Sequence, residues 1–151
     1  MKSNPTNYAE WVEIFDYIES WEIGHTDSKV NQALNNGTIK WVSGVAERYT
    51  NRLLDLINNR FNKLNKFYND RCANNFSLFE FQKTLITFRK ELIFLKQLAN
   101  LKTLPDNIKE KLSVDIMEFA KNAQKNLEAG ASKDLSGEIK RMVLGNRIDN
   151  I

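Results

Sequence analysis

The side chains that could act as a nucleophile or a general base are few. His25 is the single histidine and follows Gly24 in a predicted turn, and Cys72 is the single cysteine and follows Arg71. A nucleophilic cysteine needs a base within hydrogen-bond reach, and a catalytic histidine needs a partner that orients it. The neighbouring sequence supplies neither. We therefore expect His25 to be an exposed turn residue and Cys72 to be an unreactive thiol.

The chain also lacks the residue types of a metal or cofactor site. A structural zinc site takes four nitrogen or sulfur ligands, and di-metal helical bundles take a Glu-x-x-His pair from each of two helices. The acidic residues Glu10, Glu13, Asp16 and Glu19 progress around a predicted helix, as in a solvated face. Glycine-rich phosphate or dinucleotide loops and a hydrolase elbow are absent. We expect no cofactor, no metal and no catalytic activity.

Four cations form a line on the longest predicted helix, and we call Arg48, Arg52, Lys63 and Lys66 the basic ridge. They fall within about 60° of one another, at ~100° per residue. A row of asparagines adjoins them, and cations beside amides can bind the phosphates and base edges of nucleic acid. An acidic protein partner would suit the same cations. The remaining interpretations are a solvated face and docking against an acidic helix of the chain itself.

Arg60 differs from the other cations because it projects into the apolar stripe of its helix, between Leu53 and Phe67. A charge in that position must find a partner or lie at the edge of the stripe. The natural partners are the carboxylates of the first helix, or Glu91 on a later helix. We therefore expect Arg60 to form a structural ion pair.

These side chains lie on a series of predicted helices. Apolar residues recur at steps of three or four along most of the chain, without strand-like alternation. The pattern predicts an all-α helical bundle with three long antiparallel helices at about 38–70, 77–103 and 105–129. An N-terminal helix pair precedes them and a short C-terminal helix follows. Tryptophans 11, 21 and 41 lie beside the apolar stripes, so we expect most of them in the core.

Charge divides the predicted single domain, 1–151, into two parts. Residues 1–37 carry two basic and six acidic side chains, a net charge of −4, whereas residues 38–71 carry seven basic and three acidic side chains, a net charge of +4. Opposite charges attract each other within a fold. We therefore expect an acidic N-terminal segment, 1–37, to pack on the 38–151 bundle.

The helix predicted at 77–103 carries apolar residues on two faces. Ser77 and Glu80 form a capping box at its start. Beside its main stripe, Phe79, Ile86 and Ile93 form a second row about 120–160° round the helix, and we call these three residues the apolar line. A helix with two apolar faces is central to a bundle or meets a second protein. The apolar line is therefore a candidate protein interface.

Composition limits the cellular setting. No run of about 18 apolar residues occurs, so we expect no membrane association. A lone cysteine fits a reducing compartment, and we expect a cytoplasmic protein. The chain has 19 asparagines and 15 lysines. Their codons are AT-rich, which suggests a low-GC bacterium, a phage or a mobile element.

Two classes of function remain. The first is a non-enzymatic helical protein that binds another protein or a second copy of itself as a homodimer: an adaptor, an inhibitor, an immunity protein or an accessory factor. The missing catalytic groups and the apolar line favour this class. The second is a nucleic-acid-binding accessory protein that uses the basic ridge.

Overall fold

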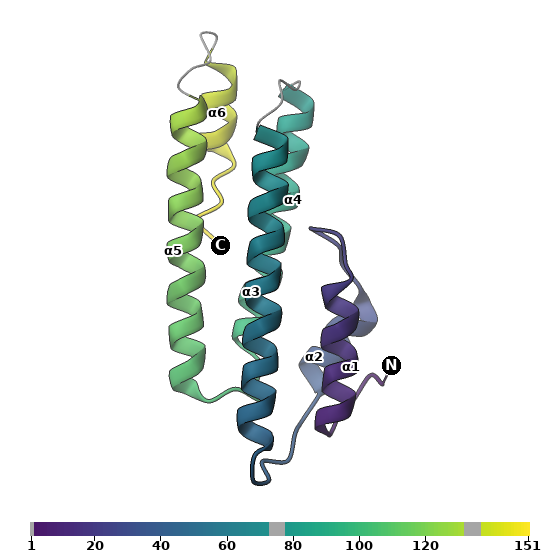
Figure 1. Cartoon of the computed structure of the whole chain (residues 1–151). Coiled ribbons are helices and arrows are strands. Elements are labelled where there is room, and N and C mark those ends of the chain that lie inside the picture. Colours follow the sequence, from purple (N-terminus) through teal and green to yellow (C-terminus); the bar gives the residue numbers. More distant parts are fainter. Residues whose placement is uncertain (1, 73–77, 132–136) are drawn as a thin grey trace.

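The computed structural model describes residues 2–72, 78–131 and 137–151. Within these residues the regular secondary structure is helical and no strand occurs, which confirms the predicted all-α bundle. The helices, in chain order, are α1 (Tyr8–Glu19), α2 (Ser28–Asn36), α3 (Val45–Cys72), α4 (Leu78–Ala99), α5 (Asp106–Ala131) and α6 (Glu138–Gly145), as labelled in Figure 1.

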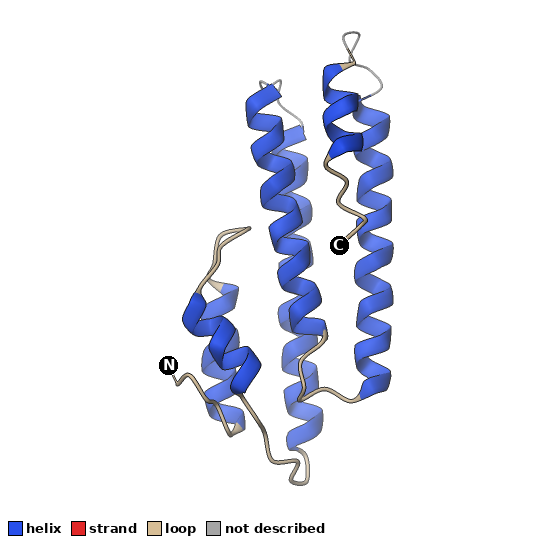
Figure 2. Cartoon of the chain, turned by 180° about the vertical axis from the view of Figure 1, so that it is seen from behind, coloured by secondary structure: helices blue, strands red, loops and turns tan. Residues whose placement is uncertain are grey.

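The three long helices form the body of the bundle. They contain 28, 22 and 26 residues, and each runs antiparallel to the one before it, as predicted (Figures 1 and 2). α1 packs on α3, while α6 packs on α5 and α4. α4 therefore lies among α3, α5 and α6, which is the central position predicted for it.

Side-chain caps explain where the two short N-terminal helices begin. The Asn7 side chain accepts the Glu10 N–H at 3.0 Å, and Asp27 accepts the N–H groups of Lys29 at 2.9 Å and Val30 at 3.3 Å. These bonds satisfy donors that lack a partner within the helix. The Val30 bond is the main cause that lowers the pKa of the Asp27 carboxyl, with the Lys29 bond adding to it.

The predicted start of the longest helix was wrong. α3 begins at Val45 and not near residue 38. Gly44 has a φ of +80°, a left-handed conformation that a right-handed helix cannot pass through. Trp41 and Val42, which the apolar pattern placed with the buried stripes, lie before this break and are exposed.

The predicted end of the next helix was also too late. α4 ends at Ala99, because the chain then turns to bury Leu101, Thr103 and Leu104. The Thr103 hydroxyl is hydrogen-bonded to the hydroxyl of Tyr49 on α3, and burial raises the pKa of that tyrosine. The predicted cap of α4, Ser77, lies outside the described residues.

Aromatic side chains join the helices of the core. Trp11, Phe15 and Tyr49 form one cluster, in which the ring centroids are 5.5–5.7 Å apart. Phe61 and Phe119 join α3 to α5 with centroids 4.8 Å apart. Such pairs add about 0.5–1.5 kcal/mol to the energy of apolar burial. The first cluster therefore holds α1 against α3.

The end of α2 is fixed by the same tryptophan. The indole N–H of Trp11 donates to the carbonyl of Thr38 at 2.9 Å. Gly37 lies under the ring, where an added Cβ would overlap the indole and approach the Ala33 carbonyl oxygen to 2.7 Å. Only glycine leaves room for this contact.

Replacing Gly37 by alanine should lower the free energy of unfolding by about 1–3 kcal/mol, because overpacking displaces the indole or the end of α2. Gly130→Ala is the control, since a Cβ added there meets no atom within 4 Å. It should be neutral or stabilising by up to about 1 kcal/mol. Urea unfolding followed by tryptophan fluorescence measures both, and equal stability of the two variants would contradict this packing.

Arg60 is fully buried, and its partner is Glu91, one of the two predicted kinds of partner. The Arg60 Nε donates to Glu91 Oε1 at 2.8 Å, and its Nη groups donate to the carbonyls of Trp21 at 2.6 Å and Glu22 at 3.3 Å. The second Glu91 oxygen accepts the N–H of Gly24 at 3.0 Å. One ion pair thus joins α3, α4 and the chain that leaves α1.

Removing either partner of this pair should be strongly destabilising. Arg60→Leu and Glu91→Leu should each lower the free energy of unfolding by about 3–5 kcal/mol, because each leaves an uncompensated buried charge. The double variant should lower the free energy of unfolding by clearly less than the sum of the two single variants, because it leaves no buried charge. Chemical denaturation of all four proteins gives the coupling. Additive losses would show that the two side chains act independently.

Candidate functional site

The two residues that could do chemistry lie on different segments of the chain. His25 is exposed in the turn after α1, where its ring packs 4.8 Å from that of Trp21. Cys72 is the last residue of α3, and its side chain lies outside the described part of the chain. Among the described residues, no three histidine, cysteine or acidic side chains gather into a possible metal site.

The basic ridge is split between internal contacts and solvent. Arg52 binds Asp16 at 2.7 Å and Glu19 at 2.9 Å, both on α1. Lys63 donates to the Trp21 carbonyl at 2.5 Å, just beyond the end of α1. Arg48 and Lys66 are exposed. Half of the predicted ridge therefore holds the acidic first helix, which was one of the interpretations left open.

Two opposing effects act on Arg52. Burial lowers the pKa of its guanidinium, but the hydrogen bonds to Asp16 and Glu19 outweigh burial and raise that pKa overall. Asn59 adds a bond to the same Glu19 carboxylate at 3.0 Å. Arg52 is therefore charged at any physiological pH and its contacts are part of the fold.

Arg52→Gln should lower the free energy of unfolding by about 0.5–1.5 kcal/mol, because two partly exposed ion pairs are lost. Arg48→Gln, on the same ridge but exposed, should change it by less than about 0.5 kcal/mol. Raising the salt concentration should shrink the difference between the two variants. Thermal unfolding at low and high salt measures this. Equal effects would mean that the α1 contacts of Arg52 carry no stability.

The outward side of α4 holds the apolar line. Phe79, Ile86 and Ile93 are 68%, 45% and 50% exposed. Lys83 and Lys90 lie between them, and all five fall within about 80° of one another at ~100° per residue. The Lys83 ammonium is 5.6 Å from the centroid of the Phe79 ring. We call these five residues the α4 face.

The α4 face is cationic as well as apolar. Glu80 is the one acidic residue among the exposed described side chains of α4, against Lys83, Lys90 and Lys96. The inner side of the helix is buried in the core by Leu85, Phe88, Leu92 and Leu95. Elsewhere in the described residues, the large exposed apolar side chains do not form such a row: Tyr17, Trp41, Val42, Val114 and Leu144.

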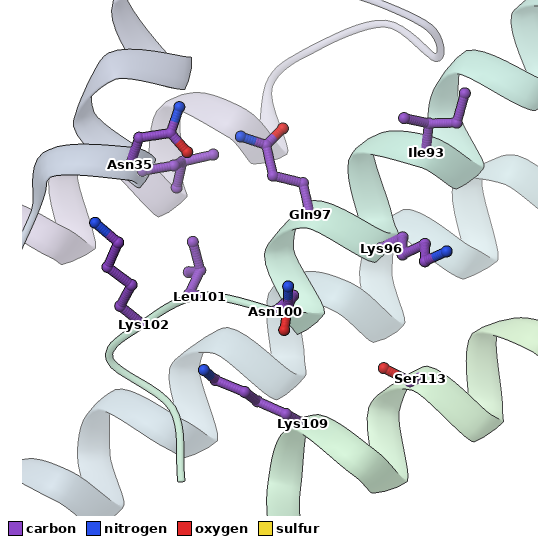
Figure 3. Close-up of a pocket in the computed structure, with 10 residues that line it drawn as sticks. Asn35, Ile93, Lys96, Gln97, Asn100, Leu101, Lys102, Lys109 and Ser113 are labelled. Carbon is purple, nitrogen blue, oxygen red and sulfur yellow. The ribbon is translucent and has the colours of Figure 1, made fainter. Parts of the chain in front are cut away.

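A cavity of about 720 Å³ adjoins the α4 face at Ile93 (Figure 3). α2, the last turns of α4, the turn that follows and the first turns of α5 meet around it. No carboxylate is among its lining residues, which are Leu34, Asn35, Ile93, Lys96, Gln97, Asn100, Leu101, Lys102, Lys109 and Ser113. We call it the lysine cavity. Sequence reasoning missed it, because no local spacing connects residues on four separate segments.

Comparison with protein-family models, curated proteins and solved structures finds no match for this chain. In the described residues, no helix is both long and apolar enough to cross a membrane.

Proposed function

We propose that the protein acts by binding another protein through the α4 face, without catalysing a reaction. The observation that carries this proposal is the exposure of Phe79, Ile86 and Ile93 in one row on a central helix. Burial stabilises an apolar side chain by about 25 cal/mol for every Å² of its surface removed from water, and an exposed side chain lacks this stabilisation. A row of three along one helix is the surface that a partner helix covers when it packs alongside.

The partner that fits is an amphipathic helix with acidic residues beside its apolar stripe. Its apolar side chains cover the apolar line, and its carboxylates lie against Lys83 and Lys90. A second copy fits less well. In an antiparallel pair of α4 helices centred on Ile86, Lys83 of one copy lies opposite Arg89 of the other. In a parallel pair, each lysine lies beside the same lysine of the other copy. Like charges in such positions oppose association.

The non-enzymatic part of the proposal is supported by how few candidate groups the chain has, one histidine and one cysteine. His25 lies in the turn after α1 with an aromatic ring beside it, and Cys72 is the last residue of α3. Acid–base or nucleophilic catalysis needs such groups within hydrogen-bond reach of each other. Adaptors, inhibitors, immunity proteins and accessory factors all act through a surface of the kind described.

Nucleic-acid binding through the basic ridge is the weaker candidate. Arg52 and Lys63 already bind α1, so only Arg48 and Lys66 remain exposed on that ridge. Nucleic-acid affinity depends on the number of phosphates neutralised, with one cation for each released counterion. Two cations provide little of that driving force.

Two model peptides of about three heptads test the proposal. Both carry leucine on one face, and one is flanked by glutamate and the other by lysine. The acidic peptide should bind and the basic one should not, with affinity that falls as salt rises. Ile86→Glu should abolish binding, whereas Val114→Glu, at a 59% exposed apolar position on α5, should not. Fluorescence anisotropy measures the affinities.

Equal binding of the acidic peptide by the Ile86 and Val114 variants would contradict the proposed surface. Sedimentation of the unmodified protein provides a second check. A dimer that Ile86→Glu dissociates would show that the α4 face binds a second copy. A tight, salt-sensitive complex with duplex DNA, lost in Arg48→Gln/Lys66→Gln, would favour the nucleic-acid alternative instead.

A further inference from the structure

We infer that the lysine cavity binds a small molecule that carries an oxyanion, either a phosphate or a carboxylate. This site is distinct from the protein-binding surface proposed above, although Ile93 borders both. Three features of the cavity support this: uncompensated cations, unpaired polar side chains and the exposed apolar side chain of Ile93.

The cations set the sign of the ligand. Within the described part of the chain, Lys102 and Lys109 have neither an ion-pair nor a hydrogen-bond partner for their ammonium groups. Lys96 is different, because its ammonium donates to the carbonyl of Ile151 at 3.0 Å and points away from the cavity in Figure 3. With no carboxylate in the lining, two positive charges face the same space. Such a concave site concentrates anions.

Neutral donors surround these charges. The amide groups of Asn35, Gln97 and Asn100 and the hydroxyl of Ser113 line the cavity, and Figure 3 shows Asn35 and Gln97 on the side reached by Lys102. In the described part of the chain, these side chains have no hydrogen-bond partner. Amides and hydroxyls donate to phosphate or carboxylate oxygens, and they fix the orientation of a group that lysine attracts only as a point charge.

The size of the cavity indicates more than a bare ion. A volume of about 720 Å³ lies within the range of about 300–1,000 Å³ that is typical of small-molecule sites. Ile93, which is 50% exposed, provides the apolar surface of the cavity, and Leu34 and Leu101 lie almost fully buried behind the lining. The ligand therefore has an anionic head group and a compact apolar body. A cation is excluded by the two free lysines.

Three probes with one aromatic ring and different head groups test this inference: phenyl phosphate, benzoate and benzyl alcohol. The full chain, labelled with ¹⁵N, is titrated with each and followed by two-dimensional NMR. The side-chain amide signals of Asn35, Gln97 and Asn100 should shift and saturate with at least one anion, and not with the alcohol. Whichever anion binds more tightly identifies the head group as phosphate or carboxylate.

Charge removal supplies the matched control. Lys102→Gln/Lys109→Gln should weaken anion binding about tenfold or more, because two charged donors are lost. Lys125→Gln/Lys140→Gln removes the same charge from exposed positions on α5 and α6 and should leave the affinity unchanged. Circular dichroism checks that both variants fold.

Three results would overturn the inference. The first is the absence of saturable shifts with either anion. The second is equal binding of benzyl alcohol, which would make the site apolar and not anionic. The third is anion binding that survives in Lys102→Gln/Lys109→Gln. Because Ile86→Glu leaves the cavity lining intact, anion binding should persist in that variant, so this inference and the proposed protein interface fail or hold separately.

Discussion

The buried ion pair of Arg60 and Glu91 is the constraint on which the arrangement of helices depends. Both side chains are 1% exposed, and a guanidinium moved from water into a protein interior must recover its hydration energy from partners. Glu91 supplies one partner, and the carbonyls of Ile18 in the last turn of α1 and of Trp21 and Glu22 just beyond it supply the others. The last carbonyls of a helix carry partial negative charge, so a cation there is doubly favoured. Arg60 therefore fixes the end of α1 against α3 and α4.

The same pair decides which side of α4 faces solvent. Glu91 must point at Arg60, and Leu92 and Leu95 beside it are buried in the core. In a helix of 3.6 residues per turn, positions about 160° away from Leu95 must then face outward, and Ile93 is one of them. A step of seven residues is nearly two full turns of the helix. Ile86 and Phe79, seven and fourteen residues before Ile93, therefore lie on the same side. The exposure of the apolar line is a consequence of inner packing and not of local sequence.

The helices and the Arg60 pairing could be predicted because each depends on residues a few positions apart or on one charge in an apolar stripe. The start of α3 was predicted too early, because apolar spacing continues through Trp41 and Val42 while the left-handed Gly44 breaks the helix between them and its body. The lysine cavity could not be predicted from the sequence for a different reason. Asn35 and Lys109 are 74 positions apart in sequence and line one space only after α2, α4 and α5 have packed.

The distribution of charge explains why the outward side of α4 is a cationic surface. Residues 1–37 and 38–71 carry −4 and +4, and in the fold Arg52 and Lys63 bind the α1 segment, so much of this charge is matched internally. Residues 72–104 carry five basic and two acidic side chains, a net charge of +3 that equals the charge of the whole chain. Because Glu91 is matched by Arg60, the unmatched charges of this segment include Lys83, Lys90 and Lys102. A negatively charged partner that approaches the protein is therefore drawn to α4 and to the turn after it, where the apolar line and the lysine cavity lie.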